Sequence, residues 1–304
     1  MLTAVSRSET KRNLLRLIKS PRVLQATLDS QRANKRRVGF VPTMGALHQG
    51  HLSLVHRAVR QNHVVVVSIF VNPTQFGSQE DFSKYPRTMA ADIQLLKRVK
   101  GSLIVFAPSV HDMYPQSPSW SFPGMENVWA DKKLSSVLCG KFRPGHFNGV
   151  CAVVSRLFNK VGPCRAYFGE KDFQQLLIVE AMVKRWRMPI QVIRCPIVRE
   201  RDGLAMASRN RYLSLLERKA ATVLSQGLRA ARMRARAGEL SATRVRRAAA
   251  TILGLEKSFK MQYLDLRSET ALRPVKTLDA AIKTRLFVAG YVGKTRLIDN
   301  TPLN

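Results

Sequence analysis

The chain has 304 residues, of which 45% are hydrophobic and 23% are charged. This composition excludes a disordered or low-complexity chain, and the length favours two domains with a cleft between them. Lysine and arginine total 51 against 20 acidic residues, so the formal net charge is +31 at pH 7. A charge of this sign favours acidic partners such as nucleotides or nucleic acid, but it identifies neither a fold nor a reaction.

The cysteines and the apolar runs bear on the cellular compartment. The four cysteines form no CxxC pair and have no histidine at zinc-finger spacing, so the sequence predicts neither a protein-bound metal nor a disulfide framework. The longest strongly apolar run, residues 64–71, has about a third of the length that a membrane-spanning helix needs. We therefore expect a soluble, cytoplasmic protein. Residues 1–15 are interpreted as a basic N-terminal extension, although their pattern loosely resembles an organelle targeting segment.

From Val38 onward, short apolar runs alternate with helical patterns, which is typical of βαβ units around a parallel sheet. Strands are predicted at residues 38–42, 64–71, 103–107, 166–168 and 190–193. An amphipathic helix is expected after Gly50, because apolar residues recur at i, i+3 and i+7 from Leu52. Further helices are predicted around residues 93–99, 150–161 and 173–186. The sequence thus predicts a Rossmann-like, doubly wound α/β domain over residues 16–197.

After Pro196 the sequence changes to arginine-rich helices, such as residues 224–237, followed by two strand-like runs at 261–266 and 285–292. We therefore expect a smaller C-terminal α+β domain over residues 198–304. Its arginine cluster comprises Arg229, Arg232, Arg234, Arg236, Arg244, Arg246 and Arg247. Because no zinc-finger or RNA-recognition signature accompanies this cluster, a solvated basic face is favoured over a nucleic-acid site, and any such binding is expected to be non-specific. Residues 115–125 are predicted to form a loop.

The segment from Thr43 to His51 lies where the first predicted strand ends and a helix begins. Ligands bind at this edge of a parallel sheet, and a helix N-terminus there offers N–H groups to phosphate. Gly45 and Gly50 would allow a close approach of the backbone, and His48 and His51 could donate to phosphate oxygens as charge develops. This spacing favours a nucleotide site over two surface histidines at a helix cap.

The pattern Thr43-x-Gly45-x-x-His48-x-Gly50-His51 resembles the signature of nucleotidyltransferases related to class I tRNA synthetases, in which an α-phosphorus is attacked and pyrophosphate leaves. Six further motifs occur in the order and spacing of the pantothenate synthetase (pantoate:β-alanine ligase) family. They are SIFVNPTQF (68–76), YPRT (85–88), FAPS (106–109), RPGHF (143–147), FGEKDFQQ (168–175) and RNxYL (209–213). The similarity runs from about residue 16 to residue 300.

The resemblance implies an ATP-dependent ligase that converts pantoate to an adenylate and then joins it to β-alanine, releasing AMP and pyrophosphate. The implied ATP site comprises Met44, Gly45, Ala46, Leu47, His48, Gln49, Gly50, His51, Gly169, Glu170, Lys171, Asp172, Val198, Met206, Ala207, Ser208 and Arg209. Its implied catalytic residues are His51, His48, Lys171 and Arg209. Gln75 and Gln175 would bind pantoate, and Gln75 would also lie near β-alanine.

The resemblance also implies Mg²⁺ with the ATP, and a homodimer. Asp172 is expected to help hold Mg²⁺ indirectly, because water and nucleotide phosphates usually supply most ligands of this ion. Ala207 departs from the family pattern, in which two consecutive serines usually precede the arginine. The alternative of a pantetheine-phosphate or nicotinate-nucleotide adenylyltransferase would explain His48 and His51, but not the motifs around Gln75 and Gln175.

Overall fold

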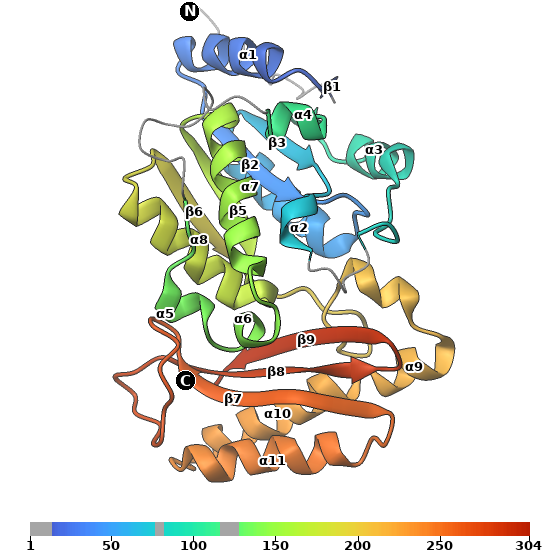
Figure 1. Cartoon of the computed structure of the whole chain (residues 1–304), viewed down its shortest axis with the longest axis vertical. Coiled ribbons are helices and arrows are strands. Elements are labelled where there is room, and N and C mark those ends of the chain that lie inside the picture. The colour runs from blue at the N-terminus through green and yellow to red at the C-terminus, as the bar shows by residue number, and fades with distance from the viewer. Residues whose placement is uncertain (1–13, 77–81, 116–127) are drawn as a thin grey trace, which may run out of the picture.

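The computed structural model describes residues 14–76, 82–115 and 128–304 (Figure 1). Within these residues the larger domain contains a six-stranded parallel sheet in the order β1-β4-β3-β2-β5-β6. Its strands are β1 (Leu14–Ile18), β2 (Val38–Thr43), β3 (Val64–Ile69), β4 (Ser102–Phe106), β5 (Cys164–Gly169) and β6 (Ile190–Cys195). The chain order reverses between β2 and β5, so the sheet is doubly wound as predicted.

Helices cover both faces of this sheet, because alternate strand residues point to opposite sides. Phe40 of β2 packs into one hydrophobic core, and its neighbour Val41 packs into the other. The first core includes α1 (Pro21–Ala33), α7 (His146–Val161) and α8 (Phe173–Arg185), and the second includes α2 (Gln49–Gln61) and α3 (Met89–Lys97). Shorter elements are η1 (Pro73–Gln75), α4 (Val110–Met113), α5 (Lys132–Ser135), α6 (Cys139–Phe142) and η2 (Glu170–Asp172).

The C-terminal part has its own core around a three-stranded antiparallel sheet. Its strands are β7 (Phe259–Ser268), β8 (Thr284–Val292) and β9 (Thr295–Pro302), and its helices are η3 (Ser208–Tyr212), α9 (Leu215–Ala220), α10 (Val223–Arg236) and α11 (Ala242–Gly254). Figure 1 shows α10 and α11 on the side of this sheet that faces away from the parallel sheet. The smaller α+β unit is therefore confirmed, and its exact boundary at Val198 stays a prediction.

Several features differ from the sequence prediction or lie beyond it. β1 begins at Leu14, so residues 14 and 15 belong to the sheet and not to the basic extension, which otherwise lies outside the described residues. The predicted strands and helices all coincide with observed ones, but β1, α1, β9 and the short helices α4, α5, α6 and α9 were not expected. Of the predicted loop at 115–125, all but Pro115 falls outside the described residues. No described helix combines the length and apolar character needed to cross a membrane.

Candidate active site

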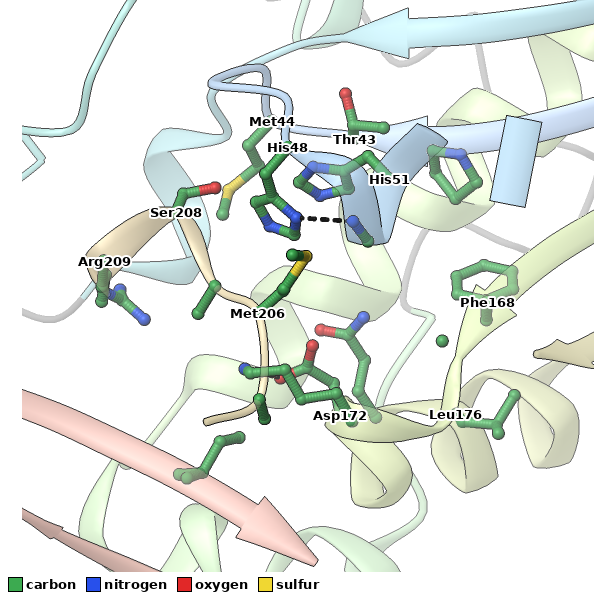
Figure 2. A pocket seen from close by; sticks show the side chains of 18 of the residues that line it. Thr43, Met44, His48, His51, Phe168, Asp172, Leu176, Met206, Ser208 and Arg209 are labelled. Carbon is green, nitrogen blue, oxygen red and sulfur yellow. Dashed lines mark hydrogen bonds and ion pairs between the residues drawn. The ribbon is translucent and has the colours of Figure 1, made fainter. Parts of the chain in front are cut away.

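A cavity of ≈ 280 Å³ lies where β2 and β5 end, at the point where the strand order reverses. Both domains line it. The parallel domain supplies the turn after β2 and the short helix η2 after β5, while the C-terminal part supplies the segment before η3 and residues 296–298 of β9. Figure 2 shows His48 and His51 side by side, with Asp172 across the cavity and Met206 between them. This is the edge at which the sequence predicted a nucleotide.

The turn after β2 is held from behind by a carboxylate that the sequence did not predict. Asp92 of α3 is buried and accepts hydrogen bonds from the backbone N–H groups of Ala46 and Leu47, at 3.0 and 2.8 Å. Gly45 has φ +81°, a left-handed conformation that favours glycine. Gly45 and Ala46 are both buried and do not line the cavity. The backbone N–H groups of Ala46 and Leu47 already have an acceptor, the carboxylate of Asp92.

His48 caps the N-terminus of α2 with its own ring. Its Nδ1 atom accepts from the backbone N–H of Gly50 at 3.1 Å, so the proton of the neutral ring resides on Nε2. A Cβ atom at position 50 would lie 2.8 Å from two atoms of this ring. Gly50 is therefore needed for the approach of the His48 ring, whereas the sequence suggested an approach of the backbone to a nucleotide.

The two imidazoles are neutral at pH 7. Burial, together with the Lys171 and Arg211 cations, lowers the pKa of His48 to about 4. Burial and the neighbouring His48 lower the pKa of His51 to about 3. The ring centroids are 4.0 Å apart, and the buried Nδ1 atom of His51 has no hydrogen-bond partner among the described residues. A neutral pair can donate to a phosphate through N–H groups without adding full charges.

The opposite wall carries charged groups on η2. The Nζ atom of Lys171 lies 3.6 Å from Oδ1 of Asp172. Desolvation inside the cleft alone would raise the pKa of Asp172 even though its side chain is partly accessible, but the Lys171 ammonium and then the Arg209 guanidinium outweigh it and hold that pKa below its ordinary value. Asp172 is therefore ionised, and 49% of its side-chain surface remains accessible through the cavity. A single accessible carboxylate fits an ion held mainly by phosphates and water, and no cluster of three or more metal-ligating side chains occurs in the described residues.

Gln75 and Gln175, which the resemblance assigns to pantoate, both line the cavity. The side chain of Asn72 donates to Oε1 of Gln75 at 3.2 Å, which orients the amide so that its NH₂ group points to Sδ of Met44, 2.8 Å away. His146 contacts the backbone oxygen of Gln75 through Nδ1 at 2.8 Å. Asn72 and His146 were not assigned roles from the sequence, although both lie inside motifs, and motif position was the signal that could have found them.

The remaining expected ATP residues divide into three groups. Gly169, Val198, Met206, Ala207, Ser208 and Arg209 line the cavity with Met44, Gly50, Lys171 and Asp172. Leu47 and Gln49 line a neighbouring hollow, which also touches His48. The carboxylate of Glu170 faces away and pairs with Arg285 at 3.0 Å. The hydroxyl of Ser208 is also occupied, because it donates to the backbone oxygen of Ala46 at 3.1 Å.

Comparison with known proteins gives a consistent result. Residues 16–302 match the family model for pantoate-beta-alanine ligase. A curated pantothenate synthetase from Thermotoga neapolitana is 47% identical over 289 residues, which is 95% of this chain and 100% of the relative. The crystal structure of pantothenate synthetase from Thermus thermophilus superposes with a TM-score of 0.86 at 44% identity, covering 94% of this chain and 98% of that one.

A more distant structure adds bound molecules. It is a pantoate-beta-alanine ligase from Francisella tularensis, described as complexed with beta-gamma ATP and beta-alanine, and it matches at 32% identity and a TM-score of 0.75. The match covers 94% of this chain and 97% of the Francisella tularensis chain. The family model spans residues 16–302 and so extends over both domains. The chain therefore belongs to the pantoate-β-alanine ligase family.

Proposed function

We propose that this chain forms pantothenate from pantoate, β-alanine and ATP through a pantoyl adenylate. The observation that supports this most directly is the pairing of two neutral imidazoles with an ionised Asp172 and two cations around one cavity. The cavity also contains two uncharged amides, Gln75 and Gln175. An adenylate-forming ligase needs both parts, a charged wall for phosphates and a neutral polar wall for a small hydroxy acid.

In the first step, the pantoate carboxylate attacks the α-phosphorus of ATP and pyrophosphate leaves. The amides of Gln75 and Gln175 bind pantoate without adding a charge that would weaken the nucleophile. Nε2–H of His48 and the ring of His51 stabilise charge that develops on the phosphate oxygens, and Lys171 and Arg209 neutralise the leaving group. Because these groups are fixed before the reaction, catalysis consists of positioning and electrostatic stabilisation.

In the second step, the β-alanine amine attacks the carbonyl carbon of the adenylate. The C–N bond forms, the carbonyl–oxygen bond to phosphate breaks, AMP leaves and the amine loses a proton. No covalent enzyme intermediate is required. The protein must instead keep water away from the mixed anhydride until the amine arrives. Gln75, which lies on the short helix η1 at the cavity wall, is placed near this amine in the proposal.

Mg²⁺, the homodimer and the cytoplasmic location belong to the same proposal. Bound with ATP, Mg²⁺ would neutralise charge on the phosphates, and the ionised Asp172 would hold its water shell. The homodimer is proposed from the family resemblance.

The basic face is formed by exposed arginines of α10 and α11, such as Arg229 and Arg246. We expect this face to bind nucleic acid at most non-specifically.

The test is an assay of products with purified protein. We expect AMP to form only when pantoate, β-alanine and ATP are all present, and pyrophosphate to form in a single turnover with pantoate and ATP alone. Pyrophosphate release with phosphopantetheine or nicotinate mononucleotide, and none with pantoate, would instead establish an adenylyltransferase with another acceptor.

A further inference from the structure

Two successive residues of β9, Asp299 and Asn300, contact two of the three chain segments proposed to hold ATP, those around residues 170–172 and 198–209. β9 runs along the side of the C-terminal sheet nearest to the parallel domain (Figure 1). Both residues are 2% exposed, and neither lines the main cavity. Neither residue belongs to the sequence motifs, and the proposed mechanism does not use them.

Asn300 holds the backbone of η2. Its NH₂ group donates to the backbone oxygens of Glu170 and Lys171, at 3.0 and 2.9 Å. Its Oδ1 atom accepts from Nη1 of Arg285 at 2.6 Å, which fixes the orientation of the amide. Arg285 in turn binds the carboxylate of Glu170 at 3.0 Å. The segment that presents Lys171 and Asp172 to the cavity is therefore attached to β9 by its backbone and to β8 by the Glu170 side chain.

Asp299 holds the second segment. Its carboxylate binds Arg199 through two hydrogen bonds, of 2.6 and 3.0 Å, a bidentate geometry that fixes direction as well as distance. Arg199 pairs with Ala205 in an isolated β-bridge, and the backbone N–H of Met206 donates to the oxygen of Val198 at 3.0 Å. This small hairpin leads directly into residues 206–209 at the cavity.

We propose that Asp299 and Asn300 are a positioning pair that sets the spacing between two of the phosphate-binding segments of the active site, η2 and residues 206–209. The inference rests on the proposed function, because it assigns Lys171 and the 206–209 segment to ATP. The backbone N–H of Asn300 also donates to Oδ1 of Asp299 at 2.7 Å, so the two anchors are coupled. A shift of β9 would move both segments together. Loss of the hydrogen bonds of either residue alone would let one segment move relative to the other.

The main test is Asn300→Asp, which replaces the donating NH₂ group with an oxygen facing two backbone oxygens. We expect the ATP KM to rise and adenylate formation to slow, each by about 10-fold or more, because small displacements of catalytic groups are costly. The pantoate KM should change less. Parental ATP kinetics in a folded Asn300→Asp protein would overturn the proposal.

Asn304 provides a matched control. Its NH₂ group also donates to two backbone oxygens, those of Asp279 and Ile282 at 2.8 and 2.9 Å, and its Oδ1 accepts from the N–H of Thr284 at 2.8 Å. Asn304→Asp makes the same chemical change away from the cavity. It should lower the thermal midpoint without raising the ATP KM. An equal rise of the ATP KM in both variants would mean that Asn300 contributes only general stability, and would refute the positioning role.

A double-variant experiment tests whether Asn300 acts through Lys171. In a Lys171→Ala background, we expect Asn300→Asp to slow adenylate formation by less than about 2-fold, because the group it positions is gone. Full additivity would contradict the proposal. If Asn300→Asp does not fold, Asn300→Ser and Arg199→Lys serve instead, since the latter keeps the charge but loses the bidentate geometry. If both Asn300→Ser and Arg199→Lys kept the ATP KM of the parent protein, the positioning role would be overturned.

A separate outcome concerns the proposed function. If the unmodified protein formed no AMP from pantoate, β-alanine and ATP, the proposed function itself would be rejected.

Discussion

The ring of His48 accepts a hydrogen bond from the backbone N–H of Gly50 through Nδ1, over 3.1 Å. This contact satisfies an amide that the first turn of a helix otherwise leaves without a partner. It also leaves Nε2–H as the one donor of the neutral ring. The same imidazole is therefore both a structural cap of α2 and the proposed donor to ATP.

The two roles of His48 can be separated with His48→Asn. Asparagine is a good N-cap, and its Oδ1 can replace Nδ1 as the acceptor, but it does not reach the position of Nε2. We expect thermal stability close to that of the parent and a rate of adenylate formation lower by about 10²-fold, the scale for one lost transition-state donor. Single-turnover kinetics and a thermal melt measure both. A near-normal rate would remove His48 from the chemistry.

Gly50→Ala tests the same contact without removing a polar group. The new Cβ atom would lie 2.8 Å from the His48 ring, so the ring must move. Alanine is the better helix former by up to about 1 kcal/mol, so a loss of activity here cannot be explained by a weaker helix. We expect slower adenylate formation with both histidines present. Parental kinetics would show that the ring position is not critical.

The strand ends made much of the cavity predictable, because apolar runs mark the cores of β2 and β5 and the polar residues after parallel strands meet at one edge of the sheet. Gln174 and Gln175, by contrast, are distinguished only by their tertiary contacts. They are adjacent in one motif, yet Gln174 is buried and donates to the backbone oxygens of Leu134 and Val137 at 2.8 and 2.7 Å, while Gln175 faces the cavity. Sequence position alone does not distinguish them.

What the sequence did not reveal depends on contacts between distant segments. Asp92 reaches the turn after β2 from α3, and nothing near it in the chain marks it as a partner of Ala46 and Leu47. β1 is an edge strand with Leu14 63% exposed, so it lacks the continuous burial that made β3 recognisable. Such features are decided by tertiary packing, which a local pattern does not record.

The adjacent glutamines give a matched pair of variants. Gln175→Ala should raise the pantoate KM far more than the ATP KM, with little change in thermal stability. Gln174→Ala should instead lower the free energy of unfolding by about 1–3 kcal/mol, because it leaves buried backbone groups without partners. Steady-state kinetics and denaturant unfolding separate the two outcomes. Equal effects of Gln175→Ala on both substrates would place that residue outside the acid pocket.

The depressed pKa values of the two histidines predict a pH dependence. Since the folded pKa values of about 4 and 3 lie below the ordinary value, folding excludes protons from both rings. The contribution of these two rings to the free energy of unfolding should therefore be constant well above pH 6.5 and fall as the pH drops through 6.5 towards 4. In NMR titrations, the ring signals of His48 and His51 should not shift between pH 8 and pH 5.5. A midpoint near 6.5 for either ring would contradict the buried, neutral pair.

Ala207 gives the last prediction, because it stands where the family usually has a hydroxyl. It lines the cavity in an extended conformation (φ −151°, ψ 145°) that serine adopts without strain. Ser208 does not supply the missing donor in this structure, since its hydroxyl donates to the backbone oxygen of Ala46 at 3.1 Å. A hydrogen bond to a charged phosphate contributes about 1.5–3 kcal/mol, which corresponds to one to two powers of ten in rate.

Ala207→Ser should therefore speed adenylate formation by roughly 10-fold or more, with little change in the pantoate KM, because the new hydroxyl would stand on the segment proposed to bind the nucleotide and not on that of Gln175. Ala207→Cys is the matched control, since it adds a side-chain atom of similar reach but only a weak donor. Single-turnover formation of the adenylate measures both variants. An equal increase in the rate of adenylate formation in Ala207→Ser and Ala207→Cys would mean that the effect comes from packing and not from the hydroxyl donor. An unchanged or slower rate in Ala207→Ser would mean that another group already satisfies this phosphate, and Arg209, which lies two residues further along the same cavity wall, would be the first to test.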